Sequence, residues 1–271
     1  MDVEELLRTA KIAARAAGKI ARERFGQPHQ IAVKGFRDLV TDADIAAQEA
    51  ITHIIRNDFP DHGFLTEEED GSLPADGPII WIIDPIDGTT NFSRNLPVFC
   101  VSIAAVQNNP PLGEKDVLAG VIYDPMRDEM FSAVLAGENQ LNDKTMRTSQ
   151  IDDIGQAQIA HDWNRAAHLR QSTLYSVTKL THEADSILTI GSAALALAWV
   201  AAGRLDGYFN YSLRAWDMAA ANLMIRQAGG QMSSLSGHAF DFSAYGNMGC
   251  LASNSNLHEP LMAFMAAHNG D

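Results

Sequence analysis

Cysteine is scarce in this chain of 271 residues. The two cysteines, Cys100 and Cys250, are too few for a disulfide framework and have no CxxC spacing. We therefore expect a reducing, cytoplasmic setting.

Positive charge is scarce as well. Lysine and arginine total 20 against 34 aspartates and glutamates, which gives a net charge of −14. An acidic surface of this kind repels nucleic-acid phosphates and anionic lipids, so we expect no nucleic-acid and no membrane partner. Hydrophobic residues make up 46% of the chain and charged residues 20%, which is ordinary globular usage and excludes a disordered chain.

Long apolar segments are also lacking. The longest uncharged run covers residues 186–203, and Thr189, Gly191 and Ser192 interrupt it. Its length would admit a membrane helix, but the interruptions and the many alanines predict a buried core segment instead. The N-terminus is charged from its second residue and has no signal-peptide stretch. The GxSxG, HExxH, Walker A and GxGxxG motifs are absent too, which excludes the enzyme classes that depend on them.

The sequence pattern predicts a mixed α and β chain in two parts. Apolar residues spaced three and four apart predict an amphipathic helix over residues 3–25. A polar stretch near residue 150 predicts a boundary between an N-terminal α+β half, 1–150, and a C-terminal α/β half, 151–271. The other expected elements are a helix at 41–58, a buried strand at 79–83, an antiparallel meander of strands at 98–107, 117–124 and 129–136, and helices at 192–202 and 216–229.

Two carboxylates stand where the predicted strand at 79–83 ends, in the segment DPID that contains Asp84 and Asp87. Acids at the end of an apolar strand are costly unless positive charge neutralises them. Hard carboxylate oxygens suit Mg²⁺, so the pair indicates a magnesium site. Capping of the following turn by Asp87 is the alternative, and it accounts for only one of the two acids.

Gly88, Thr89 and Thr90 follow directly and offer the opposite polarity. Free backbone N–H groups at the start of a helix or turn favour an anion, and the Thr89 hydroxyl can orient a water. Carboxylates that hold a metal beside amides that hold an anion are typical of metal-assisted phosphoryl chemistry. The acidic run at 67–70 (EEED), taken alone, is most simply interpreted as a solvated loop.

The residues around these acids resemble the motifs of a known enzyme family. Residues 81–92 (WIIDPIDGTTNF) are similar to the central motif of the inositol monophosphatase family. The resemblance extends over about residues 3 to 260. Four further segments resemble the family's DLVTxxD, GSAA, AGRLDGY and WDxAA…AGG motifs, at 38–44, 191–194, 202–208 and 216–230.

The resemblance implies an α+β fold, a five-layered αβαβα sandwich of two halves with the metal site between them. It implies Mg²⁺-dependent hydrolysis of a small phosphate monoester, first of all inositol monophosphate, by a metal-activated water. Inhibition by Li⁺ and assembly into a homodimer are further implications. Related sugar phosphates, histidinol phosphate and fructose 1,6-bisphosphate stay open as substrates, as does, more distantly, a non-enzymatic regulatory protein that keeps the fold.

The resemblance also implies roles for individual residues. Glu67, Asp84 and the carbonyl of Ile86 would hold one Mg²⁺, and Asp84, Asp87 and Asp217 a second. A third, weaker ion would use Glu67, which is also implied in catalysis. Asp44 and Thr89 would orient and deprotonate the attacking water. The residues implied in substrate binding are Asp87, Gly88, Thr89, Ser192, Ala193 and Asn210.

Among the positions that depart from the family pattern, two bear on the predicted site, whereas Leu188, in place of a common arginine, and the altered turn at 137–143 lie outside it. Thr66 stands where the family has a glycine before its acidic pair, which leaves the ligand open among Glu67, Glu68 and Glu69. Asn210 stands where members that act on inositol phosphates carry a glutamate that contacts the sugar hydroxyls. An amide can donate a hydrogen bond as well as accept one, so it can recognise other substrate groups than a carboxylate does. Asn210 is not among the implied metal ligands, so the difference bears on the choice of substrate and not on the hydrolysis itself.

Overall fold

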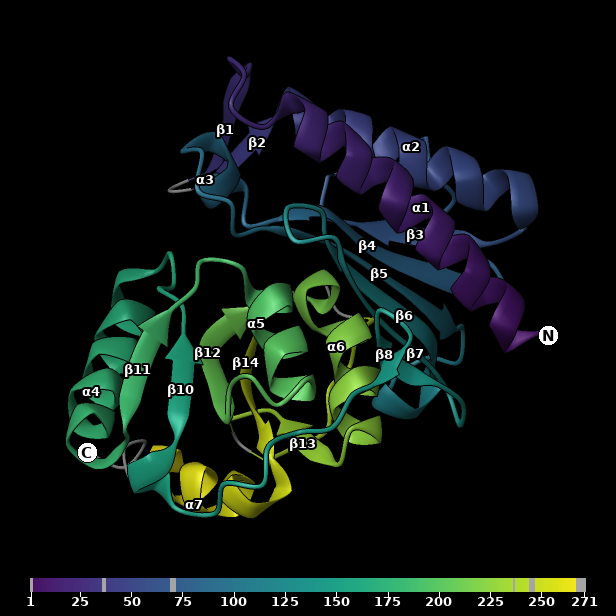
Figure 1. Cartoon of the computed structure of the whole chain (residues 1–271). Helices are drawn as coiled ribbons and strands as arrows, with labels where there is room; N and C mark the ends of the chain where they lie inside the picture. The colour runs from purple at the N-terminus through teal and green to yellow at the C-terminus, as the bar shows by residue number, and fades with distance from the viewer. Residues whose placement is uncertain (1, 36–37, 69–71, 236, 244–246, 267–271) are drawn as a thin grey trace.

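Helices and β-sheets alternate in five layers in the computed structural model, which describes residues 2–35, 38–68, 72–235, 237–243 and 247–266 (Figure 1). An outer layer of α1 (Val3–Arg24) and α2 (Asp42–Asp58) covers a seven-stranded sheet. α5 (Ala193–Ala201) and α6 (Ala215–Gln227) lie between that sheet and a five-stranded one. The far face of the second sheet carries α4 (Ala167–Glu183) and α7 (Ser255–Ala266). The predicted α+β fold, a five-layered αβαβα sandwich, is confirmed.

The seven-stranded sheet has the order β3-β4-β5-β6-β7-β8-β9. β3 runs parallel to β4, and each later pair of neighbours is antiparallel. The predicted meander is confirmed in β5, β6 and β7. The strands are β3 (Gly63–Thr66), β4 (Ile79–Asp87), β5 (Cys100–Gln107), β6 (Val117–Asp124), β7 (Glu129–Val134), β8 (Asn139–Leu141) and β9 (Lys144–Thr145).

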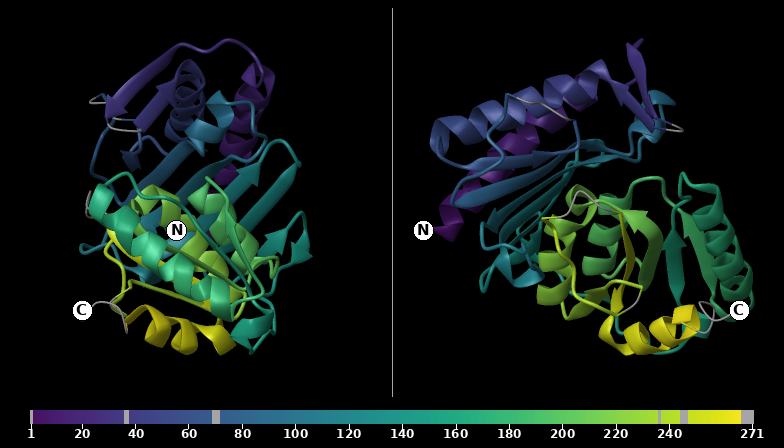
Figure 2. Two further views of the ribbon diagram at one scale, coloured as in Figure 1. Left: turned by 90° about the vertical axis from the view of Figure 1, so that its left-hand side faces the viewer. Right: turned by 180° about the vertical axis from the view of Figure 1, so that it is seen from behind.

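The five-stranded sheet is mixed and has the order β11-β10-β12-β14-β13. β10 runs parallel to both of its neighbours, whereas β14 is antiparallel to β12 and β13. In the back view of Figure 2 the two sheets lie on opposite sides of α5 and α6. The strands are β10 (Gln158–His161), β11 (Ser186–Thr189), β12 (Gly207–Leu213), β13 (Gly230–Ser233) and β14 (Met248–Asn254).

Shorter elements connect these layers. A separate hairpin of β1 (Ile31–Gly35) and β2 (Asp38–Thr41) links α1 to α2, and the single-turn helix α3 (Thr89–Ser93) follows β4. Two 3₁₀ turns, Glu114–Asp116 and Ile154–Gln156, precede β6 and β10. The division of the chain into halves at residue 150 stays a prediction.

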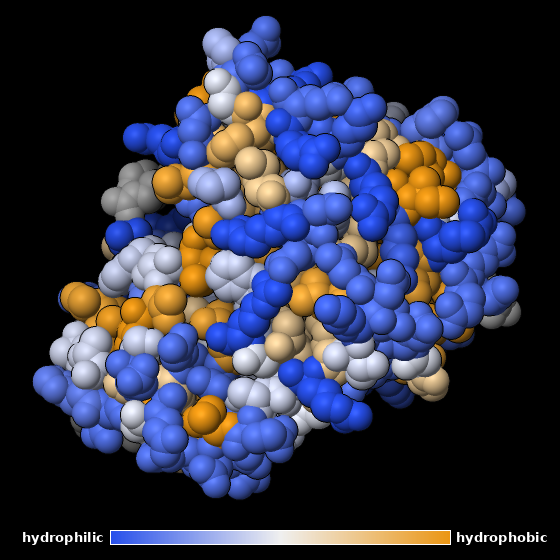
Figure 3. Space-filling view, viewed as in Figure 1, coloured by the Kyte–Doolittle hydropathy of each residue, from blue (hydrophilic) through white to orange (hydrophobic). Residues whose placement is uncertain are grey.

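The sequence patterns account for the helices and the core. Alanines on one face of α1, among them Ala10, Ala14 and Ala17, are fully buried against the sheet and α2, and their small size permits close packing. The uncharged run 186–203 is divided between β11 and α5, and α5 lies in the core as predicted. No helix among the described residues is both long enough and apolar enough to cross a membrane. Hydrophilic side chains cover most of the face shown in Figure 3.

Candidate active site

A β-bulge in β4 brings two acids onto one face of the sheet. In a regular strand, residues three apart such as Asp84 and Asp87 point to opposite faces. Here Asp84 pairs with Ser102 and Asp87 with Cys100, so three steps along β4 oppose two along β5. Pro85 lies within this bulge, where its lack of a backbone N–H costs no ladder hydrogen bond. β4 therefore runs further than the strand predicted from the sequence, and its two carboxylates reach the same side.

The third acid of the cluster, Asp217, comes from the first turn of α6. Its Oδ2 accepts the N–H of Arg214 at 2.8 Å. The Ser102 hydroxyl of β5 donates to the carbonyl of Trp216 at 3.0 Å and so ties the start of α6 to the sheet. The two acids of β4 and Asp217 each place one oxygen within 4.8 Å of the others. The DPID and WD motifs, distant in sequence, therefore meet in space.

This cluster is electrostatically unfavourable unless a cation binds to it. Burial and the negative charges of Glu67 and Asp87 raise the pKa of Asp84 well above its usual range, and burial and Asp87 do the same to the pKa of Asp217. Burial raises the pKa of Asp87 to about 6. The buried Oδ1 of Asp84 has no hydrogen-bond partner among the described residues. An orphan carboxylate oxygen among like charges fits a divalent cation with hard oxygen ligands, such as Mg²⁺.

The N-terminal end of α5 holds Asp87. The Asp87 Oδ2 accepts the Ser192 hydroxyl at 2.6 Å and the Ala194 N–H at 2.8 Å. The alternative that Asp87 caps the following turn is wrong, because Gly88 is the N-cap residue of α3 and no side-chain cap is present there. Ser192 and Ala193 thus lie beside a predicted metal ligand, and their contact with substrate stays a prediction.

Asp44 and Thr89 are in direct contact. The Thr89 Oγ1 lies 3.1 Å from Asp44 Oδ1 and 3.0 Å from the carbonyl oxygen of Ile86. The Asp44 Oδ2 accepts the N–H and the hydroxyl of Thr41 at 2.8 and 2.5 Å, which fixes the carboxylate at the start of α2. Burial raises the pKa of Asp44 to about 6, against the effect of the Thr41 hydrogen bonds. A carboxylate that titrates near neutral pH beside a hydroxyl is suited to accept a proton.

The acidic run after β3 contacts a lysine that sequence analysis missed. The Lys34 Nζ of β1 lies 2.7 Å from Glu68 Oε1 and 3.3 Å from Glu67 Oε1. Burial raises the pKa of Glu68 to about 7, and Glu67 is the acid whose charge acts most on Asp84. The solvated-loop interpretation is therefore wrong for these two glutamates, whose side chains are largely buried beside Lys34. The choice of metal ligand among the glutamates stays a prediction. Glu69 lies outside the described residues.

Asn210 is buried within a polar network. Its Oδ1 accepts the Asn164 Nδ2 at 2.5 Å and the Ser212 N–H at 2.9 Å, and its Nδ2 donates to the Tyr208 hydroxyl at 3.2 Å. Both lone pairs of the amide oxygen are therefore used within the protein. Any hydrogen bond from Asn210 to a substrate would use its second N–H, and that contact stays a prediction.

Sequence analysis also missed two residues that connect the site to its surroundings. Asp162 directly follows the strand β10 and accepts three hydrogen bonds. An acid at a strand end was the available signal, but β10 is half polar, so that signal is weaker than at Asp84. The Asn91 Nδ2 donates to the carbonyls of Val98 and Ile190 at 2.9 and 3.0 Å. Local sequence held no signal for that contact, since Ile190 belongs to a remote segment.

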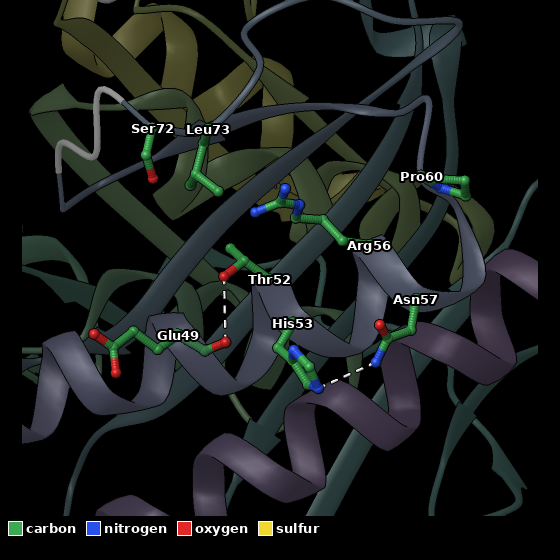
Figure 4. Close-up of a pocket in the computed structure, with 8 residues that line it drawn as sticks. All are labelled: Glu49, Thr52, His53, Arg56, Asn57, Pro60, Ser72 and Leu73. Carbon is green, nitrogen blue, oxygen red and sulfur yellow. Dashed lines mark hydrogen bonds between the residues drawn. The ribbon is translucent and has the colours of Figure 1, made fainter.

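A surface pocket on α2 does not coincide with this site (Figure 4). Its Asn57 Nδ2 lies 3.1 Å from His53 Nε2, one turn away on the same helix. None of the predicted site residues lines it. The lining residues are Glu49, Thr52, His53, Arg56, Asn57, Pro60, Ser72 and Leu73.

Comparison with known proteins matches almost the whole chain. The model of the inositol monophosphatase family matches residues 2–268. A protein of Escherichia coli (strain K12) named Nus factor SuhB is 38% identical over 263 residues, which cover 96% of this chain and 95% of the relative. The inositol-1-monophosphatase of Synechocystis is 36% identical over 271 residues, with 98% and 90% covered.

Solved structures show the same fold. The extragenic suppressor protein suhB of Bartonella henselae superposes with a TM-score of 0.89 at 32% identity and covers 98% of this chain and 100% of its own. The Thermotoga maritima IMPase gives a TM-score of 0.86 at 28% identity, with 97% of each chain covered.

Proposed function

We propose, from the premise that this chain belongs to the inositol monophosphatase family, that it is a Mg²⁺-dependent phosphatase of small phosphate monoesters, with inositol monophosphate as the first candidate substrate. Members of this family are metal-dependent. The observation that carries the proposal is the group formed by the buried Asp84 and Asp87 and the half-buried Asp217, each of which places one oxygen within 4.8 Å of the others.

The residues divide between holding the metal and handling the water. Asp84, Asp87 and Asp217 would hold one Mg²⁺, and Glu67, Asp84 and the Ile86 carbonyl a second, with a third, weaker ion at Glu67. When bound, Mg²⁺ lowers the pKa of a coordinated water and neutralises charge on the phosphate.

The Thr89–Asp44 contact provides a path for the proton of the attacking water. Thr89 can accept a proton from the water on its oxygen while its own proton passes to Asp44, 3.1 Å away. The pKa of Asp44, raised to about 6 by burial, makes this carboxylate a better base than an exposed aspartate. The N–H groups of Gly88 and Thr89 would hold the phosphate.

The contacts of Asn210 bear on the leaving group. A glutamate could accept hydrogen bonds from two vicinal hydroxyls, whereas the Asn210 oxygen is already occupied by Asn164 and Ser212. Its remaining N–H suits an acceptor on the substrate, such as an oxygen of a second phosphate. This observation keeps fructose 1,6-bisphosphate beside inositol monophosphate, with other sugar phosphates and histidinol phosphate as further candidates.

Phosphate release from these four kinds of substrate, with Mg²⁺ and with EDTA, tests the proposal. We expect Mg²⁺-dependent release from at least one monoester and inhibition by Li⁺. Release that is equal in EDTA, or absent from every monoester, would contradict it.

A regulatory role is the second candidate, because a relative carries the name Nus factor SuhB. The net charge of −14 disfavours direct contact with nucleic acid. Assembly into a homodimer and a cytoplasmic location are proposed from family membership alone.

A further inference from the structure

One turn of the chain connects a second, half-buried acid, Asp162, to Asp87. The segment between β11 and α5 contains Ile190, Gly191 and Ser192. The Ser192 hydroxyl, at the C-terminal end of this segment, donates to Asp87 Oδ2. The N–H of Ala194, the second residue of α5, donates to the same oxygen. The orientation of the Asp87 carboxylate therefore depends on the position of this turn.

Asp162 holds the other end of the turn. Its Oδ1 accepts the N–H of Ile190 at 3.0 Å and the N–H of Gly191 at 2.5 Å. Its Oδ2 accepts the Tyr208 hydroxyl at 3.0 Å, and Tyr208 in turn accepts from Asn210. A carboxylate with contacts on both oxygens is fixed in the structure.

The turn is also held from the opposite side. Asn91, which follows the DGTT segment, donates to the Ile190 carbonyl at 3.0 Å. Gly191 has φ +78°, and a Cβ built on it would come within 2.7 Å of the Asn91 side chain. Asn91 contacts the turn from α3, and Asp162 contacts it from the position directly after β10, so little freedom remains between them.

We propose that Asp162 is a positioning residue for Mg²⁺ binding, because it fixes the turn at 190–192 that orients the metal ligand Asp87. This inference rests on the proposed function, since it takes Asp87 as a metal ligand. Residues that orient metal ligands typically affect metal affinity by about 10- to 100-fold.

Calorimetric titration of Mg²⁺ into the EDTA-treated and dialysed full chain tests the inference without any substrate. Asp162→Ala removes all three hydrogen bonds, and we expect its Mg²⁺ dissociation constant to rise about tenfold or more. Asp162→Asn can keep an oxygen at the Oδ1 position for both N–H groups, so its affinity should stay within about threefold of wild type.

The matched control is Asp206→Ala. Asp206 is a buried acid at the opposite end of β10, where it accepts the Gln158 N–H at 2.7 Å and the Ser149 hydroxyl at 2.5 Å. This variant should lose stability but bind Mg²⁺ within about twofold of wild type. Equal loss of affinity in both alanine variants, or wild-type affinity in a folded Asp162→Ala, would overturn the inference.

Tyr208→Phe keeps the test decisive if Asp162→Ala does not fold. It removes only the hydroxyl that contacts Asp162, and we expect about a threefold weaker Mg²⁺ affinity; an unchanged affinity would count against the inference. Failure of the proposed function has a different signature, namely a wild-type protein that binds Mg²⁺ and hydrolyses no monoester.

Discussion

Asp87 is a buried acid whose charge the protein itself does not balance. Neutral donors, Ser192 and Ala194, contact one of its oxygens, and the like charge of Glu67 raises its pKa further. Asp124 provides a contrast, since it is also fully buried but pairs with Arg127 at 2.7 Å. The two acids should therefore respond in opposite ways when their charge is removed.

The variant Asp87→Asn should lose Mg²⁺-dependent hydrolysis by at least about 100-fold, because a metal ligand becomes neutral. Its melting temperature in EDTA should equal or exceed that of wild type, since a buried like charge is removed. Thermal melts and phosphate-release assays on the same preparation measure both effects. Asp124→Asn is the control, and it should melt lower while it keeps activity. Near-wild-type turnover in Asp87→Asn would refute the assignment of this ligand.

The helices α2 and α6 begin in the same way, and each positions an acid of the site. Asp44 and Asp217 stand three residues after the N-cap residue, and each accepts the N–H of that residue at 2.8 Å, from Thr41 and Arg214. An acid in the first turn stabilises a helix, because its negative charge interacts favourably with the positive end of the helix dipole. The same local contacts that start the helices thus hold the carboxylates in place.

The connection between β4 and α3 has little room for a side chain at Gly88, and the variant Gly88→Ala tests this. Gly88 has φ +99°, and a Cβ there would lie 3.1 Å from the carbonyl oxygens of Gly191 and Val98. An alanine costs about 1–2 kcal/mol in the left-handed region, and here it must also displace backbone next to Thr89. Urea unfolding should show this loss of stability, and phosphate release should fall with it.

Gly26→Ala is the matched control for that experiment. Gly26 has φ +78°, but a Cβ there meets nothing within 4 Å. The control should lose a similar amount of stability to the left-handed backbone conformation and should keep its activity. Full activity in a folded Gly88→Ala would mean that the close approach to Gly191 has no role in the site.

Much of the fold and part of the site could be predicted from local sequence patterns. The helices at 3–25 and 41–58 and the meander of strands were predictable because periodicity and turn residues are local signals. The bulge at Pro85 was not, since it depends on the pairing of β4 with β5. The contacts of Lys34 with Glu68 and of Asn91 with Ile190 join remote segments, for which a single sequence has no local signal.

The whole molecule carries a charge of −14, and several of its acids are buried with raised pKa values. Burial raises the pKa of Asp44 and Asp87 to about 6 and that of Glu68 to about 7, whereas the unfolded chain titrates near 4. Between about pH 4 and pH 7 the folded protein therefore binds more protons than the unfolded chain does. Its free energy of unfolding falls as the pH rises through this range.

We expect the metal-free protein to melt several degrees higher at pH 5.5 than at pH 8, since one unit of pKa shift is worth about 1.4 kcal/mol. Saturating Mg²⁺ should reduce or reverse this difference, because the ion favours the ionised carboxylates. Melting curves in EDTA and in Mg²⁺ at both pH values measure it, and Asp87→Asn should show a smaller difference than wild type. A metal-free protein that is more stable at pH 8 would contradict the prediction.

The separate origins of the cluster, with two acids on β4 and one on α6, have a consequence for folding kinetics. All three carboxylates meet only after α6 has docked on the seven-stranded sheet, so we expect Mg²⁺ to gain its full affinity late in folding. An interaction absent from the transition state slows unfolding and leaves the folding rate unchanged. At a concentration 100 times the dissociation constant the ion adds about 2.7 kcal/mol, so unfolding measured by stopped flow should slow about 100-fold. Faster refolding in Mg²⁺ would show instead that the cluster forms early. In the expected case, the bound ion sets the lifetime of the folded protein and not the speed with which it forms.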